Sequence, residues 1–148
     1  MSFTAPPHHW RNMKERYRLL GSKCENCGSS YFPQTEVCPK CRRKGRLTPI
    51  EFSGKGTIYS YSILHSGSPF FENSTPYVLA LVQLEEGPKV MSQIVDCDHD
   101  KVRIGMEVEV CFRKLFELEK SGLISYGFKF RPIDKSWMKY YNQEKTST

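Results

Sequence analysis

Short runs in which apolar and polar residues alternate occupy much of the chain after residue 47. The clearest are YVLALVQL at 77–84, KVMSQIVD at 89–96 and EVEVCFRKLFEL at 107–118. Alternation with a period of two places successive side chains on opposite faces of a strand, so each run predicts a half-buried β-strand. The turn sequence Glu85-Glu86-Gly87-Pro88 separates the first two runs, which therefore predict an antiparallel hairpin.

Two further strand-like runs complete the expected set. They are TIYSYSILH at 57–65 and LISYGFKFRP at 123–132, and TPIEF at 48–52 precedes them. A turn-rich connection, HSGSPFFENSTP at 65–76, interrupts the series. Because a small antiparallel sheet avoids exposed edges by closing on itself, we predict a five-stranded OB-fold antiparallel barrel over residues 47–132.

The N-terminal segment has a different period. PPHHWRNMKERY begins with prolines and places Trp10, Met13 and Tyr17 at i, i+3 and i+7. This spacing predicts a short amphipathic helix. The apolar stripe of that helix either packs on the rest of the chain or binds a partner, and the sequence leaves both readings open.

Four of the six cysteines form two C-x2-C pairs, Cys24 with Cys27 and Cys38 with Cys41, separated by ten residues. Two intervening residues let both thiolates point inward, and Gly28 supplies the positive φ that such a turn needs. Four thiolates fill a tetrahedral sphere and leave no position for water, so the spacing predicts one structural zinc ion per chain. A redox pair, two disulfides and iron in a rubredoxin-like site are the alternatives.

The fold class that these patterns predict is mainly β. We expect an N-terminal helical segment at 1–20, a zinc ribbon at 21–46, the barrel at 47–132 and a C-terminal tail at 133–148. The ribbon has too few apolar residues for its own core, so metal must stabilise it. The sequence contains no apolar run of membrane-spanning length and no export signal, so we expect a soluble protein of the reducing cytoplasm.

The chain is basic, with a formal net charge of +6 and an isoelectric point near 9.0. Four zinc-bound thiolates would lower that charge to about +4. Basic residues gather around the second cysteine pair, at Lys40, Arg42, Arg43, Lys44 and Arg46. This excess is compatible with a nucleic acid or a phosphorylated cofactor but is too small to require either.

Patterns typical of catalysis are missing from the sequence. Gly54-Lys55-Gly56-Thr57 contains the GK of a phosphate loop, but it lies between predicted strands and predicts a turn. His65 stands near a plausible cleft without a second catalytic group. Cys97 lies among aspartates that should raise its pKa, and Cys111 is expected to be buried. We therefore expect that the chain is not an enzyme.

The order of these motifs resembles that of one known family. The matching residues are Trp10-Arg11, Arg16-Tyr17-Arg18-Leu19, Gly21, Lys23-Cys24, Cys27-Gly28, Phe32-Pro33, Cys38-Pro39-x-Cys41, Gly54-x-Gly56-x-Ile58-Tyr59-Ser60-Tyr61, Pro76-Tyr77 and Ile104-Gly105. The sequence resembles the acyl-CoA-associated OB-fold proteins with a rubredoxin-like zinc ribbon, long catalogued as a domain of unknown function. The resemblance covers residues 3–132.

This resemblance implies a non-catalytic, acyl-CoA-binding scaffold or accessory subunit of acyl-CoA enzymes. It suggests a bridge between acetyl-CoA acetyltransferase, a thiolase, and hydroxymethylglutaryl-CoA synthase, with a shared CoA site. Candidate CoA-binding residues are Arg42, Arg43, Lys44, Arg46, Phe70 and Phe71. The basic side chains would meet the phosphates and the two aromatic residues would cover the apolar arm. The alternative is that the basic run is only solvated.

A single-stranded nucleic-acid binder is the alternative function. OB-fold barrels bind single strands by stacking bases on aromatic rings in a basic groove. Tyr59, Tyr61 and Tyr77 would provide such rings. The basic residues, however, are concentrated in the ribbon and are not interleaved with these aromatics, which favours the acyl-CoA reading.

Overall fold

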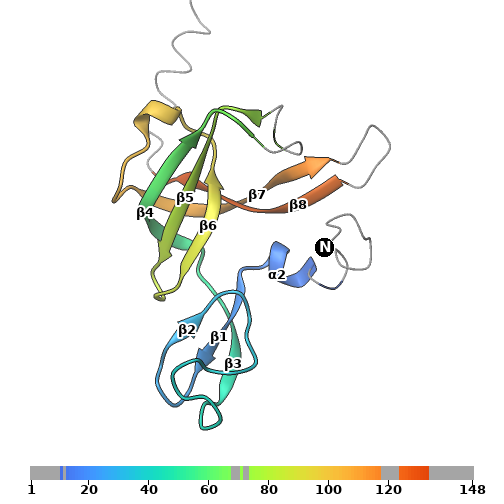
Figure 1. Cartoon of the computed structure of the whole chain (residues 1–148), viewed down its shortest axis with the longest axis vertical. Coiled ribbons are helices and arrows are strands. Elements are labelled where there is room, and N and C mark those ends of the chain that lie inside the picture. Colours follow the sequence, from blue (N-terminus) through green and yellow to red (C-terminus); the bar gives the residue numbers. More distant parts are fainter. Residues whose placement is uncertain (1–10, 12, 68–70, 72–73, 118–123, 134–148) are drawn as a thin grey trace, which may run out of the picture.

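The computed structural model describes residues 11, 13–67, 71, 74–117 and 124–133. It consists of a small three-stranded sheet, a five-stranded closed barrel and a short helix beside them (Figure 1). The elements are α2 (Met13–Tyr17), β1 (Leu20–Cys24), β2 (Ser30–Tyr31), β3 (Leu47–Glu51), β4 (Lys55–Leu64), β5 (Tyr77–Leu84), β6 (Lys89–Ile94), β7 (Glu107–Glu117) and β8 (Ile124–Pro132). A 3₁₀ turn, His99–Lys101, precedes β7.

The small sheet has the order β2-β1-β3, and both pairings are antiparallel. β3 pairs with β1 along its whole length, from Leu20 opposite Glu51 to Cys24 opposite Leu47. By strand pairing, Leu47–Glu51 therefore belongs to the ribbon sheet, although residues 47–51 were predicted as the start of the barrel. The alternating pattern identifies a strand but carries no information about its distant partner.

The barrel has the strand order β4-β5-β6-β8-β7, with β7 also pairing with β4. Five strands in one closed sheet confirm the predicted barrel, and the expected hairpin between residues 77–84 and 89–96 forms as β5 and β6. All neighbouring strands are antiparallel except β6 and β8, which run parallel and pair only at Ile94 and Phe130 among the described residues. The sheet is therefore weakly joined at this seam.

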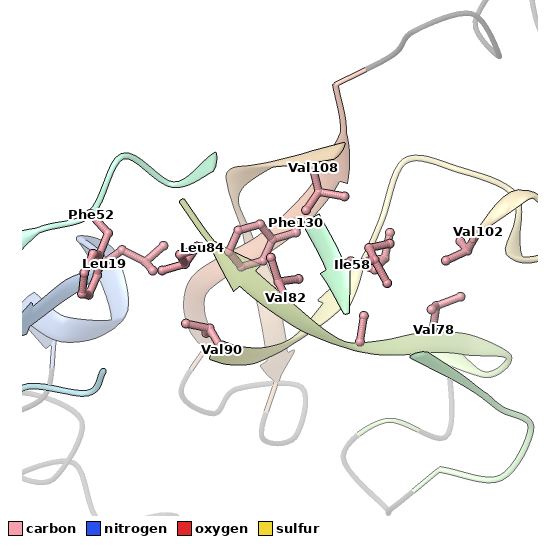
Figure 2. Packing of buried hydrophobic residues seen from close by; sticks show 12 residues of the cluster. Leu19, Phe52, Ile58, Val78, Val82, Leu84, Val90, Val102, Val108 and Phe130 are labelled. Atoms are coloured by element: carbon pink, nitrogen blue, oxygen red, sulfur yellow. The ribbon is translucent and has the colours of Figure 1, made fainter. Parts of the chain in front are cut away.

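One hydrophobic core runs through both parts of the molecule. In the barrel it contains fully buried side chains from several strands, with Phe130, Val82 and Val108 each 0% exposed. Leu19 and Phe52 belong to the same cluster although they lie just before β1 and just after β3. Figure 2 shows them at one end of a continuous row of buried side chains. The ribbon and the barrel therefore share a core.

Aromatic rings reinforce this junction. Phe32, in the ribbon, lies edge-on to Phe52 at 6.3 Å and to Phe128 of β8 at 5.6 Å between ring centroids. The Phe52 ring also covers Gly21, where an added Cβ would lie 2.4 Å from a ring carbon. Close backbone approach at this position fits the two modules tightly together.

The short helix α2 rests against the β7–β8 hairpin. Tyr17 meets Phe112 edge-on, with ring centroids 5.0 Å apart, and Met13 is half-buried. This favours the reading in which the stripe packs on the chain itself. The rest of the predicted helical segment, residues 1–10 and 12, and the tail at 134–148 lie outside the described residues. Within the described part of the chain, no helix has the length and apolar character to cross a membrane.

Candidate functional site

Two tight turns carry the cysteine pairs toward each other. In the first, the Gly28 amide donates to the Cys24 carbonyl at 2.8 Å, and in the second, the Arg42 amide donates to the Cys38 carbonyl at 2.7 Å. The residue that closes each turn has a positive φ, 71° at Gly28 and 50° at Arg42. Arg42 thus holds the place in the second turn that glycine holds in the first.

The four cysteine sulfurs converge at one point. Their Sγ atoms all lie within 4.8 Å of one another, and those of Cys27 and Cys38 are 3.7 Å apart. Tetrahedral zinc with bonds of about 2.3 Å requires sulfurs separated by about 3.8 Å. Cys24 and Cys38 are buried, Cys41 is half-buried and Cys27 is exposed. The residues present therefore fit a structural zinc ion held by four thiolates.

Hydrogen bonds to sulfur support this reading. The Asn26 side-chain amide donates to Cys41 Sγ at 3.2 Å, and the Cys41 backbone amide lies 3.4 Å from Cys38 Sγ. The Tyr31 hydroxyl is also 3.4 Å from Cys38 Sγ. Donors placed around a metal centre stabilise the negative charge of its ligands and fix their orientation.

The electrostatics of the cluster show why it needs a cation. Hydrogen bonding from Ser29 lowers the pKa of Cys27 to about 6. The Asn26 hydrogen bond lowers the pKa of Cys41, but Cys27, then desolvation by burial and the other two cysteines, raise it to about 11. Like charges this close cannot all form without compensation, and a divalent metal supplies it.

A groove of about 490 Å³ lies on the barrel, where β6 and β8 face each other beyond their single pairing. Its lining residues are Phe71, Tyr77, Leu79, Met91, Ser92, Gln93, Leu115, Phe116, Gly127, Phe128 and Lys129. Most are apolar, and three consecutive residues from each of β6 and β8 contribute. The seam between these strands therefore forms part of the groove wall.

An aromatic cluster and a lysine give the groove its character. The Phe71 ring lies 5.8 Å from Tyr77 and 6.3 Å from Phe116 between centroids. Lys129 is half-buried, and desolvation by burial lowers the pKa of its ammonium. Arg113, which is ion-paired with Asp96 at 2.7 Å, adds to that effect. The groove is thus apolar with a cationic border.

The predicted CoA-binding residues do not lie together. Arg42, Arg43, Lys44 and Arg46 are exposed in the loop between β2 and β3. This loop lies at the lower end of the molecule in Figure 1, whereas the loop between β4 and β5, which contains Phe71, lies at the upper end. Phe70 lies outside the described residues. The two parts of the predicted set therefore lie at opposite ends of the molecule, and CoA binding by either part stays a prediction.

Other residues highlighted by the sequence take ordinary places. The predicted turn at 54–57 is wrong, because Lys55 and Gly56 already belong to β4. Gly54 has a φ of 76° and an added Cβ would lie 2.3 Å from a Val110 methyl carbon, so this segment leads into a strand and is not a phosphate loop. His65 is exposed just after β4. Cys111 is buried, and burial, together with Asp98 and Asp96, raises the pKa of Cys97 to about 11.

Sequence reasoning named Phe71 as a candidate binding residue, but it missed most of the residues that line the groove. Met91 is 66% exposed although it stands in a regular strand, and Gly127 interrupts the last strand pattern. A glycine inside a strand signals a bulge or the close approach of a ligand or another backbone. The sequence therefore contained a signal at Gly127, two residues before Lys129. Nothing in the sequence predicted that β6 and β8 stop pairing beside the groove.

A thiolate-lined ribbon joined to an OB-fold barrel defines a two-module, zinc-ribbon class of protein. Residues 11–47 match the family model for the rubredoxin-like zinc ribbon domain of ChsH2, and residues 50–113 match that for its C-terminal OB-fold domain. The chain belongs to this DUF35 family.

Relatives of the chain share most of its length. It is 54% identical over 123 residues to a DUF35 domain-containing scaffold protein of Methanothermobacter thermautotrophicus, covering 83% of this chain and 92% of the relative. It is 31% identical to the benzoylsuccinyl-CoA thiolase subunit BbsA of Geobacter metallireducens, covering 75% and 73%. A solved structure titled Ltp2-ChsH2(DUF35) aldolase aligns with a TM-score of 0.65 at 30% identity, covering 90% of this chain and 99% of that one.

Proposed function

We propose that the chain is a non-catalytic accessory subunit that binds acyl-CoA and joins acetyl-CoA acetyltransferase to hydroxymethylglutaryl-CoA synthase. The observation that carries this proposal is its 54% identity, over nearly the whole length of the relative, to a protein named as a scaffold. A second relative is named as a subunit of a CoA thiolase. Both support a role beside an enzyme of acyl-CoA metabolism.

The metal centre supports a structural role. Four thiolates leave no coordination position at which water or substrate could be activated. Zinc would instead hold β1 and the loop before β3 in the form that packs on the barrel through Phe32. The six cysteines of the chain form no disulfide, which suits a protein of the reducing cytoplasm.

Reconstitution with purified enzymes tests the bridge. The thiolase and the synthase from the same organism are mixed with and without the chain and separated by size-exclusion chromatography. We expect one complex containing all three proteins, which is absent when the chain is omitted. A thiolase–synthase complex that forms equally well alone, or failure of the chain to bind either enzyme, would make the proposal wrong.

Nucleic-acid binding is the competing function, and one observation favours it. Tyr59 and Tyr61 are 54% and 38% exposed on β4, and the Lys89 ammonium lies 3.3 Å above the Tyr59 ring. Exposed rings beside a cation are typical of single-strand binding surfaces. Calorimetry with a single-stranded oligonucleotide decides the question, since tight binding without any response to acetyl-CoA would replace the acyl-CoA reading.

A further inference from the structure

The wall between β6 and β8 contains backbone groups that lie outside the single strand pairing at Ile94 and Phe130. Val95, just after β6, donates its amide to the Phe130 carbonyl at 2.8 Å, so its polar edge faces β8. Backbone groups alternate between the two edges of a strand, and those of Gln93 and Met91 therefore face β8 as well. Within the described residues, strand pairing here stops at Ile94. Two stretches of strand edge thus border the groove without a ladder between them.

A side chain marks how the seam opens. The Ser92 hydroxyl donates to the Phe128 carbonyl at 3.5 Å, where a paired sheet would have a backbone bond. This long contact places a polar carbonyl and a hydroxyl in an otherwise apolar groove. Polar groups in such surroundings gain most from a ligand that carries its own amides.

The charge at the border specifies the other end of the ligand. Among the described residues Lys129 makes no ion pair, and the nearby Arg113 is already paired with Asp96. A half-buried ammonium without a carboxylate partner favours an anion beside it. The combined chemistry is a narrow apolar chain that contains amides and carries a phosphate.

We infer that the groove binds a 4′-phosphopantetheine thioester, with its amides along the β6–β8 seam and its phosphate at Lys129. This inference rests on the proposed function and separates the ligand from the basic run of the ribbon. The phosphopantetheine arm is common to CoA and to acyl carrier proteins. The groove recognises the arm, and the experiment distinguishes CoA from an acyl carrier protein as its source.

Two groove variants and two matched controls test the inference by calorimetry with acetyl-CoA. Met91→Glu introduces a carboxylate on an exposed apolar side chain of the groove, and Ile104→Glu does so on a side chain that is 68% exposed elsewhere. Lys129→Met removes the groove cation, and Lys55→Met removes an exposed cation of β4. We expect each groove variant to weaken binding about tenfold or more and each control to leave it within about twofold.

Further ligands show which part of acetyl-CoA the groove binds and whether the phosphopantetheine arm comes from CoA or from a carrier protein. Free 4′-phosphopantetheine should retain the Lys129 effect, and adenosine 3′,5′-bisphosphate, which lacks the arm, should show no Met91 effect. An acylated carrier protein in place of acetyl-CoA distinguishes the two sources. Normal acetyl-CoA binding by both groove variants overturns the inference and leaves the proposed function intact. No binding by the wild-type chain also overturns it, whereas the bridge is judged by the enzyme reconstitution alone.

Discussion

Arg42 has a backbone conformation that costs a non-glycine residue about 1–2 kcal/mol. It closes the second cysteine turn at a φ of 50° and is itself exposed. Arg42→Gly should therefore raise the free energy of unfolding of the zinc-bound chain by about 0.5 kcal/mol, after the added entropy of the unfolded chain is subtracted. Urea unfolding measures this.

Gly28→Ala is the opposite substitution and serves as the control, because it introduces a Cβ at a φ of 71°. It should lower the free energy of unfolding by about 1 kcal/mol. A loss of stability in Arg42→Gly would show that the arginine side chain, and not the turn, matters at this position.

Gly54 combines two constraints, a positive φ and a close neighbour. Its φ is 76°, and an added Cβ would lie 2.3 Å from Val110 Cγ1. Gly54→Ala should lower the free energy of unfolding by about 3 kcal/mol, from backbone strain together with overpacking. Gly87 has a φ of 109° with nothing within 4 Å. Gly87→Ala should cost less, and equal losses would mean that contact with Val110 is unimportant.

Cys97 should react with iodoacetamide only at unusually high pH. Desolvation by burial, then Asp98 and Asp96, raises its pKa from 9.0 to about 11. The alkylation rate, followed by peptide mass spectrometry, should keep rising toward pH 11, whereas in the urea-unfolded chain it should level off above about pH 9. Because the folded pKa is raised, the associated stability is present below pH 9 and is lost as pH rises through 11. A plateau near pH 9 in the folded chain would contradict this.

The two kinds of site differ in how far sequence could predict them. The metal ligands were predictable because a C-x2-C turn is local and its spacing alone sets the direction of both sulfurs. The groove residues Lys129 and Met91 were not predictable from the sequence. They lie in regular strands and line a groove only because β6 and β8, which are distant in sequence, do not pair there. Exposed arginines such as Arg43 carry no such constraint, so their number near the cysteines was misleading.

At the scale of elements, zinc and the ribbon sheet should form together. Cys24 is the last residue of β1 and pairs with Leu47, so the metal fixes the end at which β1 meets β3. Metal analysis should find about one zinc per chain and almost none in Cys38→Ser. Hydrogen exchange in that variant should show lost protection in Leu20–Cys24 and Leu47–Glu51.

Tyr77–Leu84 is the internal reference for this experiment, since it lies wholly in the barrel. Its protection should persist at 25 °C, with a lower melting temperature because Leu19 and Phe52 share the barrel core. Complete loss of protection there would show that ribbon and barrel unfold as one unit.

The sequence predicted which segments form strands better than it predicted which strands pair with each other. The alternation of β5, β6 and β7 predicted half-buried strands and a closed sheet, because burial of one face imposes a period of two. β3 obeys the same rule, yet it completes the ribbon. The convergence of the four cysteines brings the segment after Cys41 back beside β1, and the alternating pattern does not encode this.

At the scale of the whole molecule, the basic run lies in the loop between β2 and β3, at the lower end of the molecule in Figure 1. The groove, in contrast, is lined by residues of the barrel strands β5–β8 and by Phe71. Charges are screened over about 10 Å at 0.1 M salt, so the ribbon should contribute little to a ligand in the groove. Replacing Arg42, Arg43 and Lys44 together by Ala should leave acetyl-CoA affinity within about twofold. Its salt dependence should also be unchanged, whereas Lys129→Met should reduce that dependence. Calorimetry at about 0.01 M and 0.1 M salt measures both. A weaker salt dependence in the triple variant would instead show that the phosphates bind to the ribbon.

The pairing of β1 with β3 also bears on the order in which the protein matures during synthesis. Every strand of the ribbon sheet lies before residue 52, so this module can take up metal while the barrel is still being translated. The barrel must wait, because β8 pairs with both β6 and β7 and is the last described strand to leave the ribosome. Until then Phe32, whose ring also meets that of Phe52, lacks the ring of Phe128 against which it packs. A nascent chain would therefore carry a finished metal centre with an exposed aromatic face, ready to receive the barrel when its final strand arrives.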